Sequence, residues 1–167
     1  KVKLEAAVDP DDKNAWFHCA SLGEFEQGRP VIEAYREKYP DHKIIVTFFS
    51  PSGYELRKNY KYADYVGYLP MDSKSNAKAL LKIINPVVAF FIKYEFWYHY
   101  LTQLRKRRVP TYAISSIFRP AQLFFKWYGG WYRLFLRCFE HIFVQEQGSI
   151  DLLKTINYTR ASVAGDT

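Results

Sequence analysis

Cysteine is scarce in this sequence: only Cys19 and Cys138 occur among 167 residues, and neither belongs to a C-x-x-C or zinc-type spacing. This pattern argues against a disulfide framework and a structural zinc site, and we expect two reduced, buried thiols. Long hydrophobic runs are also missing. The longest run without a polar residue near the middle of the chain is Val87–Ile92, whereas a transmembrane helix needs about 20 apolar residues. The sequence carries no signal-peptide pattern.

Several catalytic and cofactor motifs are absent as well. The chain has no G-x-G-x-x-G and no G-x-x-x-x-G-K-[ST], the glycine-rich fingerprints of dinucleotide and nucleoside-triphosphate sites. Ser21 does not fit the G-x-S-x-G of hydrolases because position 19 is a cysteine. The four histidines are scattered and form no H-E-x-x-H. We therefore expect no hydrolase triad, no cofactor and no protein-bound metal, and we interpret His18, inside an apolar run, as a hydrogen-bonded core residue.

What the sequence does contain is a globular composition with two biases. Apolar residues make up 49% and charged residues 25% of the chain, which is typical of one folded domain. Aromatic residues reach 19%, and 24 basic residues face 17 acidic ones, for a net charge of +7. A basic, aromatic-rich surface suits nucleic acid, anionic lipid or another phosphate-bearing partner.

Apolar runs alternate with helical patterns along the chain. The pattern predicts strands at Ala15–Cys19, Lys43–Phe49, Tyr65–Leu69, Val87–Ile92, Thr111–Ser115, His141–Gln145 and Ala161–Ala164. Helices are expected between them, including Phe96–Arg108 and a long aromatic helix or helix pair that bends at Gly129–Gly130 and ends near Phe139. Strands that alternate with helices indicate right-handed β-α-β units. The expected fold class is therefore α/β, a Rossmann-like doubly wound and mostly parallel sheet.

Two carboxylates follow strands that should be neighbours. In the common order 3-2-1-4-5-6, the first and fourth strands meet at the switch point where such folds bind ligands. Glu24 follows the first strand and Glu95 follows the fourth. Glu24 also fits a capping box with Ser21, and Glu95 also fits the first turn of a helix, so a structural and a functional interpretation stay open for both. A carboxylate at a helix start is stabilised as the anion, which would lower its basicity.

Basic residues gather in two groups. Arg105–Arg108 end a helix, where the helix dipole alone would favour them. Arg119, Lys126, Arg133 and Arg137 have spacings of 7, 7 and 4, which would place them on one face of a helix. The aromatic residues around this second group favour an interfacial membrane element over a solvated basic stripe. Ser50, Ser52 and Gly53 begin another helix, where they either cap it or hold a phosphate or sugar.

Four motifs, in register, resemble a known family. His18–Glu24 resembles the His-x-x-Ser-x-Gly-Glu signature of the 3-deoxy-manno-octulosonic acid (Kdo) transferases of lipopolysaccharide synthesis. Thr47–Gly53, Tyr68–Asp72 and Tyr94–Trp97 are similar to its Thr-rich Pro-x-Gly, Leu-Pro-x-Asp and Glu-x-Glu-x-Trp segments. The first Glu of the last segment is Lys93 here. Ala164–Thr167 resembles the start of the crossover into a second domain.

The resemblance implies the amino-terminal acceptor domain of a two-domain GT-B glycosyltransferase. Residues 1–164 would form this domain, and residues 165–167 would begin the linker to a carboxy-terminal donor domain, with a membrane anchor expected before the chain. Such an enzyme transfers Kdo from CMP-Kdo to a lipid A precursor, with inversion, on the cytoplasmic face of the bacterial inner membrane. The chain alone is expected to be inactive because half the cleft lies outside it.

The resemblance also implies roles for individual residues. Glu24 would be the catalytic base and Glu95 the second carboxylate of the cleft. The residues expected to bind the acceptor are Ser21, Gly23, Ser50, Ser52, Gly53 and Arg119. Those expected to contact membrane or lipid are Lys126, Trp127, Trp131, Arg133 and Arg137.

A non-catalytic alternative is a basic module that binds phosphates or nucleic acid on a Rossmann-like scaffold. It accounts for the charge and the aromatic residues but not for two carboxylates at the switch point, which would repel phosphates. We therefore expect no nucleic-acid partner. A third interpretation is a catalytically dead scaffold that docks on a membrane; Glu24 and Glu95 argue against it.

Overall fold

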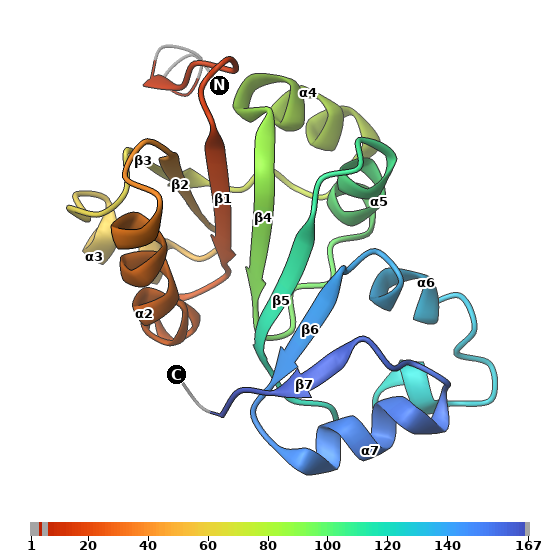
Figure 1. Ribbon diagram of the computed structural model, residues 1–167. Coiled ribbons are helices and arrows are strands. Elements are labelled where there is room, and N and C mark those ends of the chain that lie inside the picture. Colours follow the sequence, from red (N-terminus) through yellow and green to blue (C-terminus); the bar gives the residue numbers. More distant parts are fainter. Residues whose placement is uncertain (1–3, 5–6, 166–167) are drawn as a thin grey trace.

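A computed structural model describes Leu4 and residues 7–165 of the chain, and they form a parallel sheet covered by helices (Figure 1). Seven strands lie in the order β3-β2-β1-β4-β5-β6-β7, and every neighbouring pair is parallel. The strands are β1 (Asn14–Cys19), β2 (Lys43–Phe48), β3 (Tyr65–Tyr68), β4 (Pro86–Ile92), β5 (Thr111–Ser116), β6 (His141–Val144) and β7 (Ala161–Val163). The helices are α2 (Leu22–Lys38), α3 (Pro51–Arg57), α4 (Lys74–Ile84), α5 (Tyr98–Lys106), α6 (Arg133–Leu136) and α7 (Gln147–Thr155), with a short 3-10 turn, η1, at Leu123–Phe125. The α/β, Rossmann-like doubly wound sheet expected from the sequence is confirmed.

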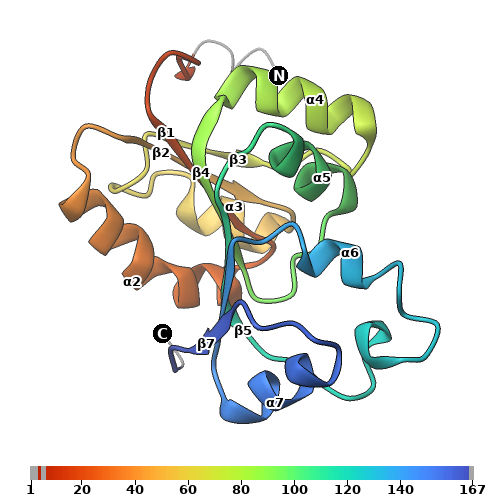
Figure 2. The ribbon, with the colours of Figure 1, turned by 45° about the vertical axis from the view of Figure 1, so that its right-hand side comes forward.

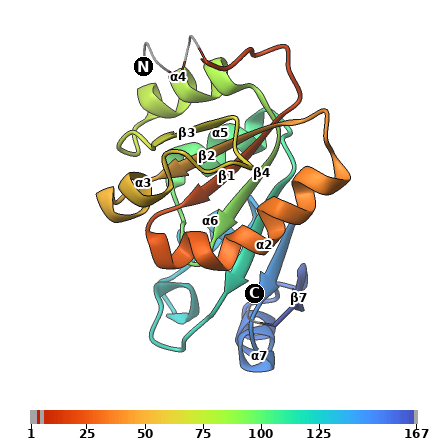
Figure 3. The same ribbon diagram turned by 90° about the vertical axis from the view of Figure 1, so that its left-hand side faces the viewer.

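The helices form one layer on each face of the sheet. Figures 2 and 3 show α2 and α3 on one face and α4, α5 and α6 on the other. Each layer closes a separate buried core: Phe25 and Ile32 of α2 pack on one side, and Leu81, Leu101 and Leu153 belong to the other. This arrangement follows from the strand order, because right-handed crossovers change face when the chain returns from β3 to β4.

Local signals fix the ends of several elements. Ser50 caps α3, where its side chain accepts a hydrogen bond from the Ser52 N–H, and Pro51 occupies the first helical position. α4 ends at Asn85, which adopts a left-handed conformation with φ of 34°, and Pro86 then begins β4. Because β1 and β4 pair in parallel, the loops that follow these two strands lie at the same edge of the sheet.

The segment between β5 and β6 contradicts the sequence-based prediction. Instead of a long aromatic helix or helix pair, it contains the turn η1 and the four-residue helix α6, joined by irregular backbone. A Cβ atom on Gly129 would lie 2.0 Å from the Leu123 carbonyl oxygen, so the chain turns back on itself too tightly for a continuous helix. Arg119, Lys126, Arg133 and Arg137 therefore do not form one stripe on a helix.

The expected domain boundary lies at the end of the described chain. Gly165 follows β7 with φ of 80°, a left-handed conformation that suits glycine. The other two residues of the expected linker, 166 and 167, lie outside the described residues. The domain limits of 1–164 stay a prediction.

Candidate active site

The two expected carboxylates lie at the same edge of the sheet. β1 and β4 are hydrogen-bonded neighbours, with His18 opposite Phe91 near their carboxyl ends. Glu24 occupies the first turn of α2 just after β1, and Glu95 lies in the loop between β4 and α5. The assumption that the first and fourth strands are neighbours is thus confirmed. Helix starts and strand ends converge here, at the switch point of the sheet.

Glu24 is a structural cap. Its Oε2 accepts hydrogen bonds from the backbone N–H of Ala20 and, at 3.2 Å, from that of Ser21, the N-cap residue of α2. This contact ties the end of β1 to the start of the helix. The capping-box interpretation is therefore confirmed.

The same carboxylate has a perturbed affinity for protons. Burial, and next the negative charge of Glu95, raise the pKa of Glu24 from its ordinary value of 4.5 to about 7. The two backbone hydrogen bonds and the positive charge of Lys93 act in the opposite direction and are outweighed. The helix start lowers the pKa of Glu24 in the expected direction, but desolvation dominates, so the net pKa is raised. Near pH 7, Glu24 is able both to hold and to release a proton.

The Glu95 carboxylate contacts two side chains. Its Oε2 lies 3.2 Å from His18 Nε2 and also accepts a hydrogen bond from the Trp97 indole N–H. Its side chain is only 12% exposed, and His18 is fully buried. The strand residue and the loop residue together fix the orientation of this carboxylate.

The contacts of His18 belong to a continuous hydrogen-bonded chain. Trp16 Nε1–H can only donate, and it donates to Thr47 Oγ1 at 2.8 Å. His18 Nδ1 lies 3.0 Å from Thr47 Oγ1 and 3.1 Å from the Thr47 carbonyl oxygen, and His18 Nε2 faces Glu95. Both ring nitrogens of this buried residue thus have partners, and the prediction of a hydrogen-bonded core histidine is confirmed.

Lys93 stands where the resemblance expects another glutamate. It adopts φ of 64° at the turn after β4, and Ser116 Oγ donates to its carbonyl oxygen at 3.0 Å. Its charge lowers the pKa of Glu24 slightly. Position 93 therefore contributes an ammonium group where the resemblance expects a carboxylate.

The polar residues expected to bind an acceptor are distributed around this edge. Ser21 caps α2, and exposed Gly23 has nothing within 4 Å of the position of an added Cβ. Gly53 has a packing reason for being glycine, since a Cβ there would lie 2.2 Å from Phe48 Cδ1. Ser50 is occupied as the cap of α3, whereas Ser52 is exposed. A binding role for these residues stays a prediction.

In the basic and aromatic segment between β5 and β6, some of the residues expected to contact membrane or acceptor are exposed, and others make contacts within the segment. Trp127 is 92% exposed, and Arg119 is also exposed. The Arg133 guanidinium instead holds the loop together, donating to the carbonyl oxygens of Phe124 and Lys126 at 2.9 and 3.0 Å. Trp131 rests on Tyr98 and Phe135. Across the described part of the chain, no helix has both the length and the apolar character to cross a membrane.

One further side chain at this edge has a contact that the sequence does not predict. Asp72, the last residue of the Leu-Pro-x-Asp segment, accepts hydrogen bonds from the backbone N–H of His99 and Tyr100 at 3.1–3.3 Å, while Ser73 caps α4. It thereby fixes the start of α5, immediately after Glu95 and Trp97. No pattern within 72–85 reveals this contact, because its partners follow a different strand. Among the described residues, no group of three or more His, Cys, Asp or Glu side chains could hold a metal ion.

Comparison with solved structures defines the class of protein. The chain is similar to UDP-GlcNAc 2-epimerase from Neisseria meningitidis bound to UDP-GlcNAc (TM-score 0.67, 13% identity, 92% of this chain and 47% of that one). It is likewise similar to the UDP-GlcNAc 2-epimerase from Methanocaldococcus jannaschii (TM-score 0.62, 14% identity, 92% and 45%). At such identities these matches show the fold alone, a Rossmann-like α/β domain that corresponds to about half of each neighbour.

Sequence comparison gives the family. The family model described as 3-deoxy-D-manno-octulosonic-acid transferase (kdotransferase) matches residues 2–167, and the chain belongs to this family as its amino-terminal domain. The 3-deoxy-D-manno-octulosonic acid transferase of Aquifex aeolicus is 25% identical over 154 residues, which are 90% of this chain and 39% of the relative. Those of Chlamydia trachomatis serovar D and Haemophilus influenzae are each 28% identical, over 103 and 102 residues, which are 60% of this chain and 24% of each relative. The chain thus spans about a quarter to two fifths of these curated relatives.

Proposed function

We propose that this chain is the acceptor half of a glycosyltransferase of lipopolysaccharide synthesis, which transfers Kdo from CMP-Kdo to a lipid A precursor. The observation that carries the proposal is the Glu24 carboxylate, whose pKa of about 7 matches a general base that works near neutral pH. Membership in the Kdo transferase family supports the choice of sugar.

In the proposed reaction, Glu24 accepts the proton of an acceptor hydroxyl. The hydroxyl oxygen then forms a bond to the anomeric carbon of Kdo, on the face opposite the leaving group. The bond between that carbon and the phosphate oxygen of CMP breaks, and its electron pair leaves with CMP. Inversion at the anomeric carbon follows from this single displacement.

Glu95 is proposed as a positioning residue for the base. It raises the pKa of Glu24 through its charge, and the contacts with His18 and Trp97 fix its orientation. Ser21, Gly23 and Ser52 border the same edge and are proposed to face the acceptor.

We further propose that the loop from 117 to 132 contacts the cytoplasmic face of the bacterial inner membrane. Its exposed Trp127, Tyr128 and Trp131 are amphipathic side chains of the kind that settle at a bilayer surface, and Arg119 and Lys126 suit anionic headgroups. A lipid acceptor would be drawn from that surface.

The test is Kdo transfer from CMP-Kdo to a lipid A precursor by the longer protein that carries this chain. Glu24→Gln should lower kcat/KM by roughly 100-fold or more, the loss expected for a general base. The matched control is Glu37→Gln, which removes the same charge from an exposed position of the same helix. Near wild-type transfer by Glu24→Gln would leave Glu24 as a cap only. A folded but inactive protein that binds nucleic acid with a steep salt dependence would instead favour the non-catalytic alternative.

A further inference from the structure

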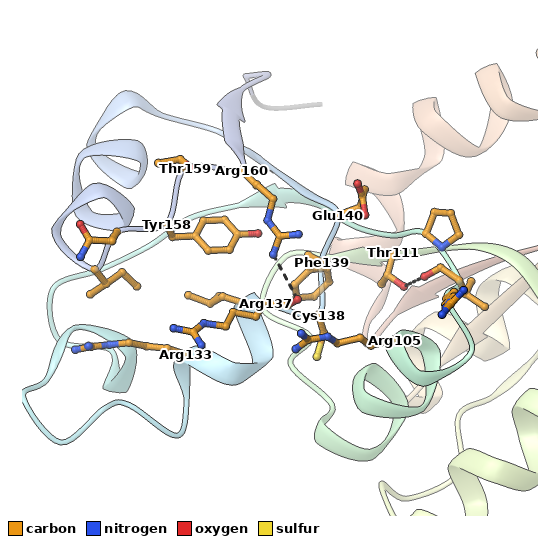
Figure 4. A pocket seen from close by; sticks show the side chains of 16 residues that line it. Arg105, Thr111, Arg133, Arg137, Cys138, Phe139, Glu140, Tyr158, Thr159 and Arg160 are labelled. Atoms are coloured by element: carbon orange, nitrogen blue, oxygen red, sulfur yellow. Dashed lines mark hydrogen bonds between the residues drawn. The ribbon is translucent and has the colours of Figure 1, made fainter.

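A basic pocket lies at the opposite edge of the sheet from Glu24 and Glu95. Its volume is about 800 Å³, within the range of small-molecule sites. Its walls include Thr111 at the start of β5, Glu140 just before β6 and Arg160 just before β7, so the pocket opens at the amino ends of these strands. Figure 4 shows arginine side chains entering it from the helix side and from the strand side.

Positive charge dominates this pocket. Five arginines line it, Arg105, Arg108, Arg133, Arg137 and Arg160, against the single carboxylate of Glu140. Three helices, α5, α6 and α7, also end here, and each exposes the negative end of its dipole, equivalent to at most about half a charge. Once Glu140 and these helix ends are subtracted, at least about two and a half of the five positive charges stay uncompensated. Helix capping alone does not account for the group.

The arginines have no acidic partner in the part of the chain that the structure describes. None of the five forms an ion pair there. Arg133 uses donors on loop carbonyls, and Arg160 Nη2 makes one 3.4 Å contact with the Arg137 carbonyl oxygen. Arg105 lies beside the Cys138 thiol. Most of the guanidinium N–H groups of the five arginines thus form no hydrogen bond with a described residue.

A buried hydroxyl on the same wall also lacks a partner. Tyr158 is only 8% exposed, and its hydroxyl forms no hydrogen bond with any described residue. The Arg160 guanidinium lies 5.6 Å from the centre of its ring. Burial raises the pKa of Tyr158 to about 12, so the group is a donor at neutral pH. An unpaired buried donor is unfavourable, and a ligand oxygen in the pocket would satisfy it.

We propose that this pocket binds the phosphate groups of a small anionic ligand, at a site separate from the proposed transfer reaction. Guanidinium groups bind phosphate oxygens through paired N–H donors, and four arginines besides Arg133 are more than one carboxylate could engage. The ligand sits between the end of α5, the end of α6 and the turn before β7. It therefore joins three segments that are far apart in the sequence.

The first experiment measures the Kd of pyrophosphate with the protein and with two variants, Arg105→Gln and Arg160→Gln. Each variant should raise the Kd about tenfold or more, because each removes a charge-assisted hydrogen bond. The matched control is Lys106→Gln, which removes the same charge from the next position of α5, outside the pocket. Equal Kd values for wild type and both arginine variants, or an equal loss in Lys106→Gln, would overturn the proposal.

A second variant separates a binding role for the hydroxyl from a structural one. Tyr158→Phe keeps the ring and removes only the unpaired hydroxyl, so the melting temperature without ligand should stay the same or rise. The Kd of pyrophosphate should nevertheless increase several-fold. An unchanged Kd in a folded Tyr158→Phe protein would remove Tyr158 from the site and count against the proposed pose.

A third experiment distinguishes a lipid headgroup from a soluble phosphate ester as the ligand. Vesicles of phosphatidylcholine with phosphatidic acid should displace pyrophosphate if the ligand is a lipid headgroup, and Arg105→Gln and Arg160→Gln should weaken that displacement. Displacement by soluble phosphate esters but not by vesicles would assign a soluble ligand. Both results support a phosphate site. Pyrophosphate binding that survives the double variant Arg105→Gln/Arg160→Gln would refute it.

Discussion

Two roles meet in the Glu24 side chain. Its Oε2 holds the backbone of Ala20 and Ser21, as a helix cap should, while burial and the neighbouring Glu95 make the same group hard to ionise. Ordinary caps are solvated and stay ionised well below neutral pH. The combination of a cap with a pKa of about 7 is what distinguishes this carboxylate from the other helix-start residues of the chain.

The pH profile of transfer tests this coupling. A base with a pKa of about 7 loses activity as the pH falls through that value, because its protonated form accepts no proton. Glu95→Gln removes the neighbouring charge that raises this pKa, so the acid limb of kcat/KM should move to lower pH. Glu37→Gln should leave the limb in place. An unshifted limb in Glu95→Gln would show that burial alone sets the pKa of Glu24.

Thr47 should matter through its hydroxyl rather than its volume. Thr47→Val keeps the shape but leaves Trp16 Nε1–H without its acceptor and removes the hydroxyl contact of His18 Nδ1. We expect a loss of about 1–3 kcal/mol in the free energy of unfolding, because the buried Trp16 N–H is left unpaired, whereas His18 Nδ1 keeps the Thr47 carbonyl oxygen at 3.1 Å. Thr111→Val is the control, because its buried hydroxyl makes only one hydrogen bond, to the Val109 carbonyl oxygen. Urea unfolding of both variants gives the comparison. Equal losses in the free energy of unfolding would contradict the role proposed for the Thr47 hydroxyl between Trp16 and His18.

At the residue scale, the sequence predicted the two carboxylates and the buried histidine because each has a local signature. Glu24 follows Ser21 by three positions, and His18 lies inside an apolar strand. The role of Asp72 and the gathering of Arg105 with Arg160 have no such signature. Their partners lie on other elements: Asp72 contacts the start of α5, and Arg105 of α5 shares a pocket with Arg160 from the turn before β7.

At the scale of elements, strands were easier to predict than the segment between β5 and β6. Runs such as Ile44–Val46 are apolar and β-branched and have few alternatives to a buried strand. In the segment between β5 and β6, the sequence spacings of 7, 7 and 4 are compatible with one face of a helix. The residues concerned are Arg119, Lys126, Arg133 and Arg137. The helix does not form because of contacts that a periodic pattern cannot predict. Gly129 packs on the Leu123 carbonyl, and Arg133 donates to two loop carbonyls.

The irregular loop gives the membrane proposal a sharper test than a helix would. Trp127 is almost fully exposed, so Trp127→Ala should reduce binding to vesicles that contain anionic lipid and leave the melting temperature unchanged. Met71→Ala is the control, since Met71 is 67% exposed on a different loop. Co-sedimentation with vesicles measures the effect. Identical binding by wild type and Trp127→Ala would exclude this side chain from the membrane contact.

For the molecule as a whole, Glu24 imposes a dependence of stability on pH. Its pKa is about 7 when folded and near 4.5 when solvated, so the folded state holds the proton more tightly. The stability that this proton contributes is fully present below about pH 4.5 and declines as the pH rises through about 7. As the pH rises across this range, the melting temperature should therefore fall more steeply for wild type than for Glu24→Gln. Parallel curves would contradict the raised pKa.

A second prediction concerns catalysis by the isolated chain. The curated relatives are longer, and this chain spans 39% of the Aquifex aeolicus protein. We expect residues 1–167 alone to fold but not to turn over CMP-Kdo, because the donor is proposed to bind mainly elsewhere. The longer protein under the same conditions is the positive control. Measurable release of CMP by the isolated chain would refute the expectation.

The order of the strands also affects how the chain folds while it emerges from the ribosome. β1 is central, yet one of its two partners arrives late: Ala15 pairs with Val88, 73 positions further along. At about 5–20 residues per second, one edge of β1 waits roughly 4–15 s for β4. During that interval, β1 lacks its pairing with β4, and Trp16 and Phe17 lack their ring contacts with Phe91 and Phe90. Nascent chains arrested before Pro86 should therefore be the ones that recruit chaperones or aggregate.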